Sequence, residues 1–147
     1  MKDASKIISC FTDEYGGFFG KFSPEEDSNE SSASASSPDG DNTSTICVEF
    51  PENLLDEFEN RRSYIMSKRK RLEPMGKLDE FSHPRDSDDS YGGILNFDLN
   101  GKSGGFFFYT ARKKDALIFI NAYSTSGKGQ ISDMERDHLI DSILSMI

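Results

Sequence analysis

The chain has 147 residues, of which 26 are acidic and 17 basic, so its formal net charge is −9 at pH 7. The length suits one small domain, but an apolar share of 35% is low for a chain that packs along its whole length. No run of about 18 apolar residues occurs, which excludes a membrane-spanning helix, and the first residues lack an apolar stretch of signal-peptide length. We therefore expect a cytoplasmic protein. Cys10 and Cys47 share no metal-ligand spacing with the two histidines, so we expect reduced thiols, no metal and no cofactor.

The acidity is concentrated in the first 60 residues. Residues 1–60 contain 14 acidic and 3 basic residues, whereas residues 61–147 contain 12 and 14. Residues 1–22 are rich in aromatic side chains and are broken by glycines, which indicates a short docking segment. Residues 23–44 contain eight serines, six acids, no base and no apolar residue larger than alanine. Such a composition buries too little apolar surface to offset the entropy of ordering, so it predicts a disordered linker.

Residues 45–147 are predicted to form the folded domain. β-branched and apolar residues alternate over residues 45–50, which indicates a strand. Pro51 and the helical spacing of the apolar residues after it predict a helix over residues 52–71, which Pro74 and Gly76 would end. Residues 77–90 are predicted to be an acidic loop with at most one short helical turn.

Three strand-like runs follow, at residues 93–99, 105–110 and 116–123, with turns predicted between them at residues 100–104 and 112–115. The last run is apolar at consecutive positions, which predicts a central strand. Ser132 and Glu135 have the spacing of a capping box before an apolar helical pattern, which predicts a C-terminal helix. We therefore expect a small α+β fold with an antiparallel or mixed sheet in the order β-α-β-β-β-α.

The densest positive charge lies in the first predicted helix, at Arg61, Arg62, Lys68, Arg69, Lys70 and Arg71. Several of these side chains share a helix face and could contact an RNA backbone together. The competing interpretation is a solvated helix end whose bases complement the helix dipole, and a nuclear-localisation signal is a weaker third. The last predicted turn could add RNA contacts through Arg112, Lys113 and Lys114, although a solvated turn is the simpler interpretation.

Four short stretches, taken together and in order, resemble the RelE/HigB superfamily of toxins. They are Gly92-Gly93-Ile94, Gly101-Lys102-Ser103-Gly104-Gly105, the apolar strand ending in Ala122-Tyr123-Ser124, and Ile131-Ser132-Asp133-Met134-Glu135 at the start of the last helix. The resemblance covers about Ile46 to Ile147 and implies a RelE-like fold. It also implies a type II toxin that acts on translation as a ribosome-dependent endoribonuclease, with an antitoxin as partner and ribosome-bound mRNA as target.

The resemblance further implies that Lys and Arg side chains hold the phosphate and stabilise the charged transition state. This chain departs from the family at most of those positions, where it has Leu95, Asn96, Asp98, Phe107 and Thr125. The remaining catalytic candidates are Lys102, Tyr123 and Lys128. Because the loss of one such donor costs roughly 10²- to 10³-fold in rate, we expect cleavage to be weak or absent.

Two classes of function follow. The first is a RelE/HigB-like toxin, active or attenuated, that acts on translating ribosomes. The second is a non-enzymatic interaction or regulatory protein that has kept the scaffold for binding, which the net charge favours because excess acidity slows approach to RNA. In a combined form, the acidic N-terminal segment would lie across Arg61–Arg71 and mask the basic helix.

Overall fold

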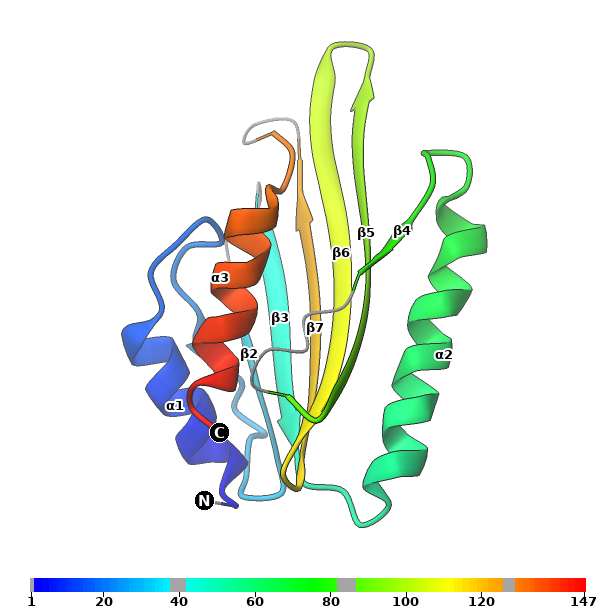
Figure 1. The fold of residues 1–147 in the computed structure, drawn as a ribbon. Coiled ribbons are helices and arrows are strands. Elements are labelled where there is room, and N and C mark those ends of the chain that lie inside the picture. The colour runs from blue at the N-terminus through cyan, green and yellow to red at the C-terminus, as the bar shows by residue number, and fades with distance from the viewer. Residues whose placement is uncertain (1, 38–41, 82–86, 126–128) are drawn as a thin grey trace.

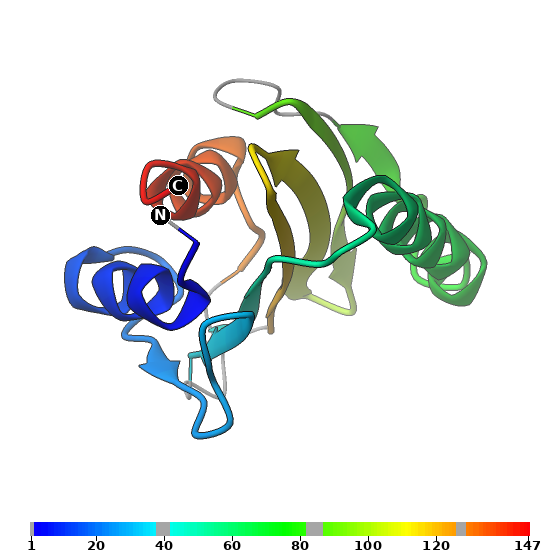
Figure 2. The ribbon, with the colours of Figure 1, turned by 90° about the horizontal axis from the view of Figure 1, so that it is seen from below.

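The computed structural model describes residues 2–37, 42–81, 87–125 and 129–147, which form a seven-stranded antiparallel sheet and three helices (Figure 1). The strand order is β1-β2-β3-β7-β6-β5-β4. The strands are β1 (Ser23–Pro24), β2 (Ser32–Ser36), β3 (Asn42–Glu49), β4 (Asp79–Phe81), β5 (Asp89–Leu99), β6 (Lys102–Lys113) and β7 (Ala116–Ser124). Helices α1 (Ala4–Glu14) and α3 (Asp133–Leu144) cover one face of the sheet, and α2 (Leu54–Leu72) lies on the other (Figure 2). The fold class is α+β, as predicted.

The order of elements differs from the prediction in two respects. A short strand, β4, lies in the segment predicted to be an acidic loop and pairs with β5. In addition, α1, β1 and β2 precede the predicted β-α-β-β-β-α series, and β2 continues the sheet beyond β3. One sheet therefore extends across the boundary that we placed before residue 45.

The disordered linker predicted for residues 23–44 is wrong for the described part of that segment. β2 pairs with β3 from Ser32↔Glu49 to Ser36↔Thr45. Ala33 and Ala35 are buried, and Ser32, Ser34 and Ser36, which alternate with them, lie on the other face. Alanine side chains are large enough to hold β2 in the sheet, because α1 packs directly on this strand and β3 supplies its backbone hydrogen bonds. Residues 38–41 of the predicted linker lie outside the described residues.

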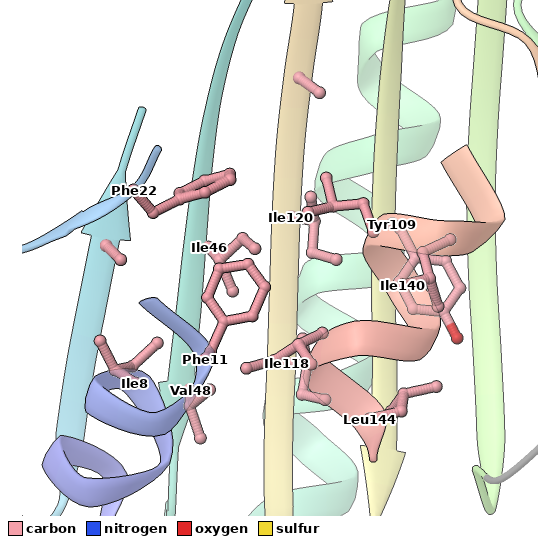
Figure 3. Close-up of a cluster of buried hydrophobic side chains, with 14 of the residues drawn as sticks. Ile8, Phe11, Phe22, Ile46, Val48, Tyr109, Ile118, Ile120, Ile140 and Leu144 are labelled. Atoms are coloured by element: carbon pink, nitrogen blue, oxygen red, sulfur yellow. The ribbon is translucent and has the colours of Figure 1, made fainter. Parts of the chain in front are cut away.

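The aromatic N-terminal segment is part of the hydrophobic core. The side chain of Asp3 caps α1 by accepting a hydrogen bond from the Lys6 N–H. The helix buries four apolar residues at i, i+3, i+4 and i+7, namely Ala4, Ile7, Ile8 and Phe11. Figure 3 shows Phe11 and Phe22 beside Ile46 and Val48 of β3. This spacing was visible in the sequence and indicates a helix, which our interpretation of the segment as a docking element missed.

β7 is the central strand of the sheet, as predicted. Its first five residues, Ala116 to Ile120, are buried on both faces. The predicted C-terminal helix is also confirmed, because the Ser132 hydroxyl accepts a hydrogen bond from the Glu135 N–H at 3.1 Å. Its buried side chains are Leu139, Ile140, Ile143 and Leu144.

The paired glycines of β5 and β6 make room for side chains that lie over them. Gly92 lies under Phe81, Gly93 under Leu78, Gly104 under Phe97 and Gly105 under Asn96. A Cβ atom at any of the four would come within 2.7 Å of the covering side chain. Since neighbouring residues of a strand face opposite sides, each pair admits one side chain on each face. The glycine pattern on which the family resemblance depended thus has a packing role in this sheet.

Candidate nucleic-acid interface

The catalytic candidates do not share one site in the described part of the chain. Lys102 begins β6 opposite Leu99 and is exposed. Tyr123 pairs with Phe106, four residues farther along β6, which corresponds to about 13 Å at the usual rise of a strand. Cleavage requires several groups held about 3 Å from one reacting oxygen. The separation argues against a catalytic site formed by Lys102 and Tyr123, and Lys128 lies outside the described residues.

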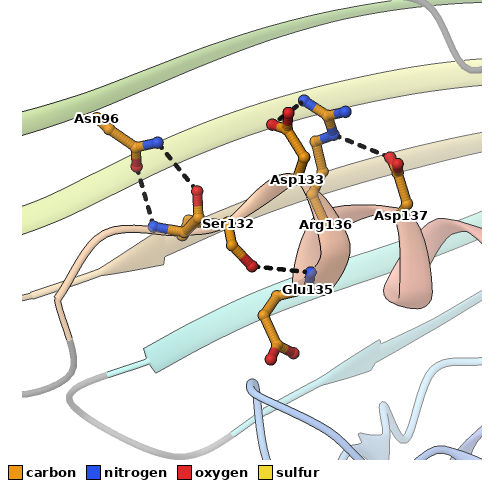
Figure 4. Close-up of polar contacts among 7 residues, drawn as sticks. Asn96, Ser132, Asp133, Glu135, Arg136 and Asp137 are labelled. Carbon is orange, nitrogen blue, oxygen red and sulfur yellow. Dashed lines mark hydrogen bonds and ion pairs between the residues drawn. The ribbon is translucent and has the colours of Figure 1, made fainter.

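Asn96 and Phe107, two positions at which the resemblance would place bases, have structural roles in this chain. The Asn96 side chain donates to the Ile131 carbonyl at 2.9 Å and accepts from the Ile131 N–H at 3.0 Å, which fixes the segment that leads into α3 (Figure 4). Phe107 is fully buried on the α1/α3 face. Both side chains therefore contribute to packing and anchoring.

The first two arginines of α2 are each paired with an acid. Arg61 donates to a carboxylate oxygen of Glu49 on β3 at 2.8 Å, and both side chains are partly shielded from solvent. Arg62 lies 3.6 Å from Glu59 of the same helix. Its guanidinium is 5.2 Å from the centre of the Tyr91 ring of β5. These contacts hold the middle of α2 against the sheet and partly neutralise the two arginines.

Arg69 is held against the sheet by a polar cluster. Its guanidinium donates to Glu80 Oε1 at 2.5 Å, and the Tyr91 hydroxyl donates to the same oxygen at 3.0 Å. These hydrogen bonds, chiefly the one from Arg69, hold the pKa of Glu80 below its ordinary value of 4.5. The pKa of Tyr91 is raised, first by partial burial and then by its bond to Glu80. Glu80 therefore remains ionised and offsets the charge of Arg69.

The C-terminal half of α2 keeps cations that no described acid neutralises. The Lys68 ammonium lies 4.7 Å from the centre of the Tyr64 ring and 5.8 Å from that of Phe108 on β6. Lys70 and Arg71 are exposed and form no ion pair with any residue in the described ranges. Residues 61–78 as a whole contain seven bases and one acid. This end of α2 is the strongest candidate for contact with an anion.

The lysines predicted to contact RNA from the β6–β7 turn bond to the last residues of the chain, and the predicted RNA contact stays a prediction. The Lys113 ammonium donates to the Leu144 carbonyl and that of Lys114 to an Ile147 oxygen, both at 2.9 Å. The last four carbonyls of an α-helix lack the usual N–H partner four residues on and carry partial negative charge. Arg112 is half-buried. Lys113 therefore stabilises the C-terminal end of α3, and Lys114 holds Ile147, three residues beyond that helix.

A row of three aromatic side chains crosses the α2 face of the sheet. It consists of Phe97 on β5, Phe106 on β6 and Tyr123 on β7, and we call it the aromatic row. Ring centroids are 5.8 Å apart for Phe97 and Phe106 and 6.3 Å apart for Phe106 and Tyr123. Tyr123 is 37% exposed and the two phenylalanines are half-buried. The sequence signal was the alternation of Phe106 and Phe108 about the buried Phe107, which we had assigned only to a strand.

Cations flank the aromatic row along β6. Phe108, which carries Lys68 over its ring, is two residues from Phe106 on the same face, or about 7 Å. Lys102 is four residues from Phe106 in the other direction. The C-terminal end of α2 and the turn between β5 and β6 lie at the same end of the molecule (Figure 1). Aromatic rings and cations thus share one surface.

The described part of the acidic N-terminal segment does not form the predicted mask over the basic helix. α1 lies on the opposite face of the sheet from α2 (Figure 2). Phe11, Phe19 and Phe22 are at most 2% exposed, so they cannot dock on α2 without leaving the core. The physical reason is that this segment completes the core beside β2 and β3, which outweighs attraction between distant charges.

No protein-family model matches the chain, and no curated protein matches its sequence. None of the described helices combines the length and apolar character that a membrane span requires. Within the described ranges, no three His, Cys, Asp or Glu side chains are grouped to hold a metal ion. The candidate interface is defined by its own geometry: the aromatic row, Lys102 and the basic end of α2.

Proposed function

We propose that this protein binds RNA through the α2 face of its sheet and does not cleave it. The observation that carries the proposal is the positive charge at the C-terminal end of α2, at Lys68, Lys70 and Arg71, which no acid in the described ranges neutralises. Phosphate contacts by Lys and Arg supply most of the affinity of proteins for nucleic acid backbones. Lys102 adds a cation at the same end of the molecule.

The resemblance to RelE/HigB toxins suggests the setting for this binding. In this proposal the series from β3 to α3 is a RelE-like scaffold that retains contact with ribosome-bound mRNA and has lost the catalytic bases. Asn96 and Phe107 support the loss, because their side chains anchor α3 and fill the core. An antitoxin, if the chain has one, would bind over α2. An active mRNA interferase is the alternative that the experiments below must distinguish.

The proposal can be tested by measuring RNA affinity against salt. A labelled 12-nucleotide single strand is titrated with the protein between 50 and 200 mM salt. Four phosphate contacts predict a slope of about −3 for log affinity against log salt, since each contact with a single strand contributes roughly −0.7. Combined Lys68→Ala, Lys70→Ala and Arg71→Ala substitutions should reduce the slope to about −0.7, the value left by Lys102 alone.

A matched control separates the effect of losing contacts at this surface from the effect of changing the net charge of the protein. Lys2, Lys6 and Lys21 are exposed on the α1 side of the molecule. Their combined replacement by alanine removes the same charge from the opposite face and should leave the salt slope nearly unchanged. Equal losses in the two triple variants would show that attraction is not localised to α2 and would contradict the proposal.

Cleavage is tested separately, with labelled mRNA on translating ribosomes. We expect intact mRNA after incubation with the full chain. Cuts that disappear in a Lys102→Ala variant would instead establish an active interferase. If expression of the parent chain arrests growth without mRNA cleavage, and the α2 triple variant does not arrest growth, RNA binding is the cause of the arrest.

A further inference from the structure

We infer that the aromatic row accepts an unstacked single strand of RNA, with one base on each of three rings, and excludes duplex RNA. This inference rests on the proposed function and adds the substrate class. The cations of the α2 face account for binding to phosphates, but they assign no role to the aromatic row. Aromatic side chains on an open sheet are a recurring platform for splayed bases, because every base has a face that can stack.

The spacing of the rings favours separated bases. Successive bases in a strand of double-stranded DNA lie 3.4 Å apart along the axis, and those of an RNA duplex are no farther apart, whereas neighbouring rings of the row are 5.8 and 6.3 Å apart. A strand that placed one base on each ring would therefore have to unstack its bases from one another. Paired bases cannot do this without losing their partners, so a duplex does not fit.

The inclination of the rings also suits this role. Planes within the row differ by 34° and 40°, so no ring stands edge-on to the next. The core pairs Phe11–Phe22 and Phe18–Phe19 are close to perpendicular, at 72° and 85°. In a perpendicular pair the edge of one ring covers the face of the other, and the smaller angles of the row avoid that obstruction.

Gly104 keeps the row in place. Phe97 pairs with Gly104 across the strands, and its ring lies over the glycine. A Cβ at position 104 would stand 2.6 Å from Cζ of Phe97 and 2.5 Å from the Ser124 carbonyl oxygen. Any larger residue would therefore displace the first ring. Phe106 and Tyr123 form a direct cross-strand pair, which fixes the other two.

The flanking cations complete the site. Lys68 lies on the α2 side of the row and Lys102 on the side of the β5–β6 turn, so a strand crossing from β5 to β7 has a cation beside each edge. This arrangement predicts that rings and cations contribute separately. Removal of one ring should weaken single-strand binding roughly 5- to 150-fold, the usual range for loss of one base–aromatic stack.

The test uses the full chain and two probes: a 12-nucleotide single-stranded RNA and the same strand annealed to its complement. We expect the duplex to bind at least tenfold more weakly. Tyr123→Leu and Phe106→Leu should weaken single-strand binding without changing duplex binding. Tyr123→Phe keeps the ring and should restore the parent affinity, while Phe18→Leu, on the α1 side, serves as the control for loss of an aromatic residue.

The outcomes separate this inference from the proposed function. Equal affinity for single strand and duplex would overturn the inference, as would a Tyr123→Leu variant that melts cooperatively and binds single strands as the parent does. If either result were found and the α2 triple variant nevertheless lost RNA binding, the proposed function would hold, but the aromatic row would have no part in it. Absence of binding to both probes would overturn the two together.

Discussion

The two faces of the sheet are built on different principles. The α1/α3 face is closed by apolar contacts, and α3 buries four of its 12 residues. α2 has 19 residues and buries only Phe58 and Ile65. Much of its remaining contact with the sheet is made by arginine, lysine and tyrosine side chains. The first face therefore supplies the stability of the fold, and the second leaves charged and aromatic groups accessible for binding.

Removal of residues 1–31 should have the largest effect, because it opens the apolar α1/α3 face. Residues 1–31 contribute five large buried side chains, Ile7, Ile8, Phe11, Phe19 and Phe22. Each is worth about 1.5–3 kcal/mol, so together they approach the roughly 5–15 kcal/mol that stabilises a whole domain. We expect the truncated chain to lose its cooperative thermal transition, measured by circular dichroism. Asp13→Ala with Glu14→Ala is the control for the same segment, and a truncated chain that still melted cooperatively would refute the assignment of α1 to the core.

A smaller effect is expected from alkaline pH, through a tyrosine of the α1/α3 face. Burial raises the pKa of Tyr109 to about 12 from an ordinary value of 10. Because the folded pKa is the higher one, stability is complete below pH 10 and falls as the pH rises from 10 to 12. Two pKa units correspond to about 2–3 kcal/mol. Chemical unfolding at pH 9 and pH 11.5 should show this loss, and Tyr109→Phe should reduce it; an unchanged profile in the variant would assign the alkaline loss to other groups.

The anchor of α3 should contribute somewhat less. Asn96→Ala removes both hydrogen bonds to the Ile131 backbone. Two net hydrogen bonds are worth about 1–3 kcal/mol, and the loss should appear in urea unfolding. Asp98→Ala, an exposed change two residues along the same strand, should cost less than about 0.5 kcal/mol. Equal costs in the two variants would show that the bonds to Ile131 do not hold α3.

The smallest effect concerns the attachment of α2. The pKa of Glu80 is lowered by its bonds to Arg69 and Tyr91, so its contribution is present above pH 4.5 and disappears as the pH falls below that value. The side chain is exposed, and salt should screen the interaction. We expect α2 to loosen at acid pH in the parent chain and Glu80→Gln to abolish this pH dependence. The measurement is the rate of amide hydrogen exchange in α2 relative to α3. Loosening that persisted in the variant would place the titrating group elsewhere.

Local patterns in the sequence predicted much of the folded part. The central strand, the capped C-terminal helix and α2 follow from apolar periodicity, Pro51 and Ser132, because hydrogen bonds and side-chain directions repeat every two or 3.6 residues. The same patterns did not predict β2, because its buried residues, Ala33 and Ala35, are too small to give the apolar alternation that is typical of a strand. The basic end of α2 was also visible in the sequence. The aromatic row was not recognised, since its members come from three strands.

The sequence by itself determined which segments can be helix or strand, where the charges are concentrated, and that α2 carries the densest group of cations. Only the tertiary structure decided that the acidic N-terminal segment belongs to the core, that Lys113 bonds to the last residue of α3, and that Lys68 lies over Phe108, beside the aromatic row. The physical reason is that secondary structure depends on neighbours along the chain, whereas burial and pairing depend on residues far apart in sequence, such as Asn96 and Ile131.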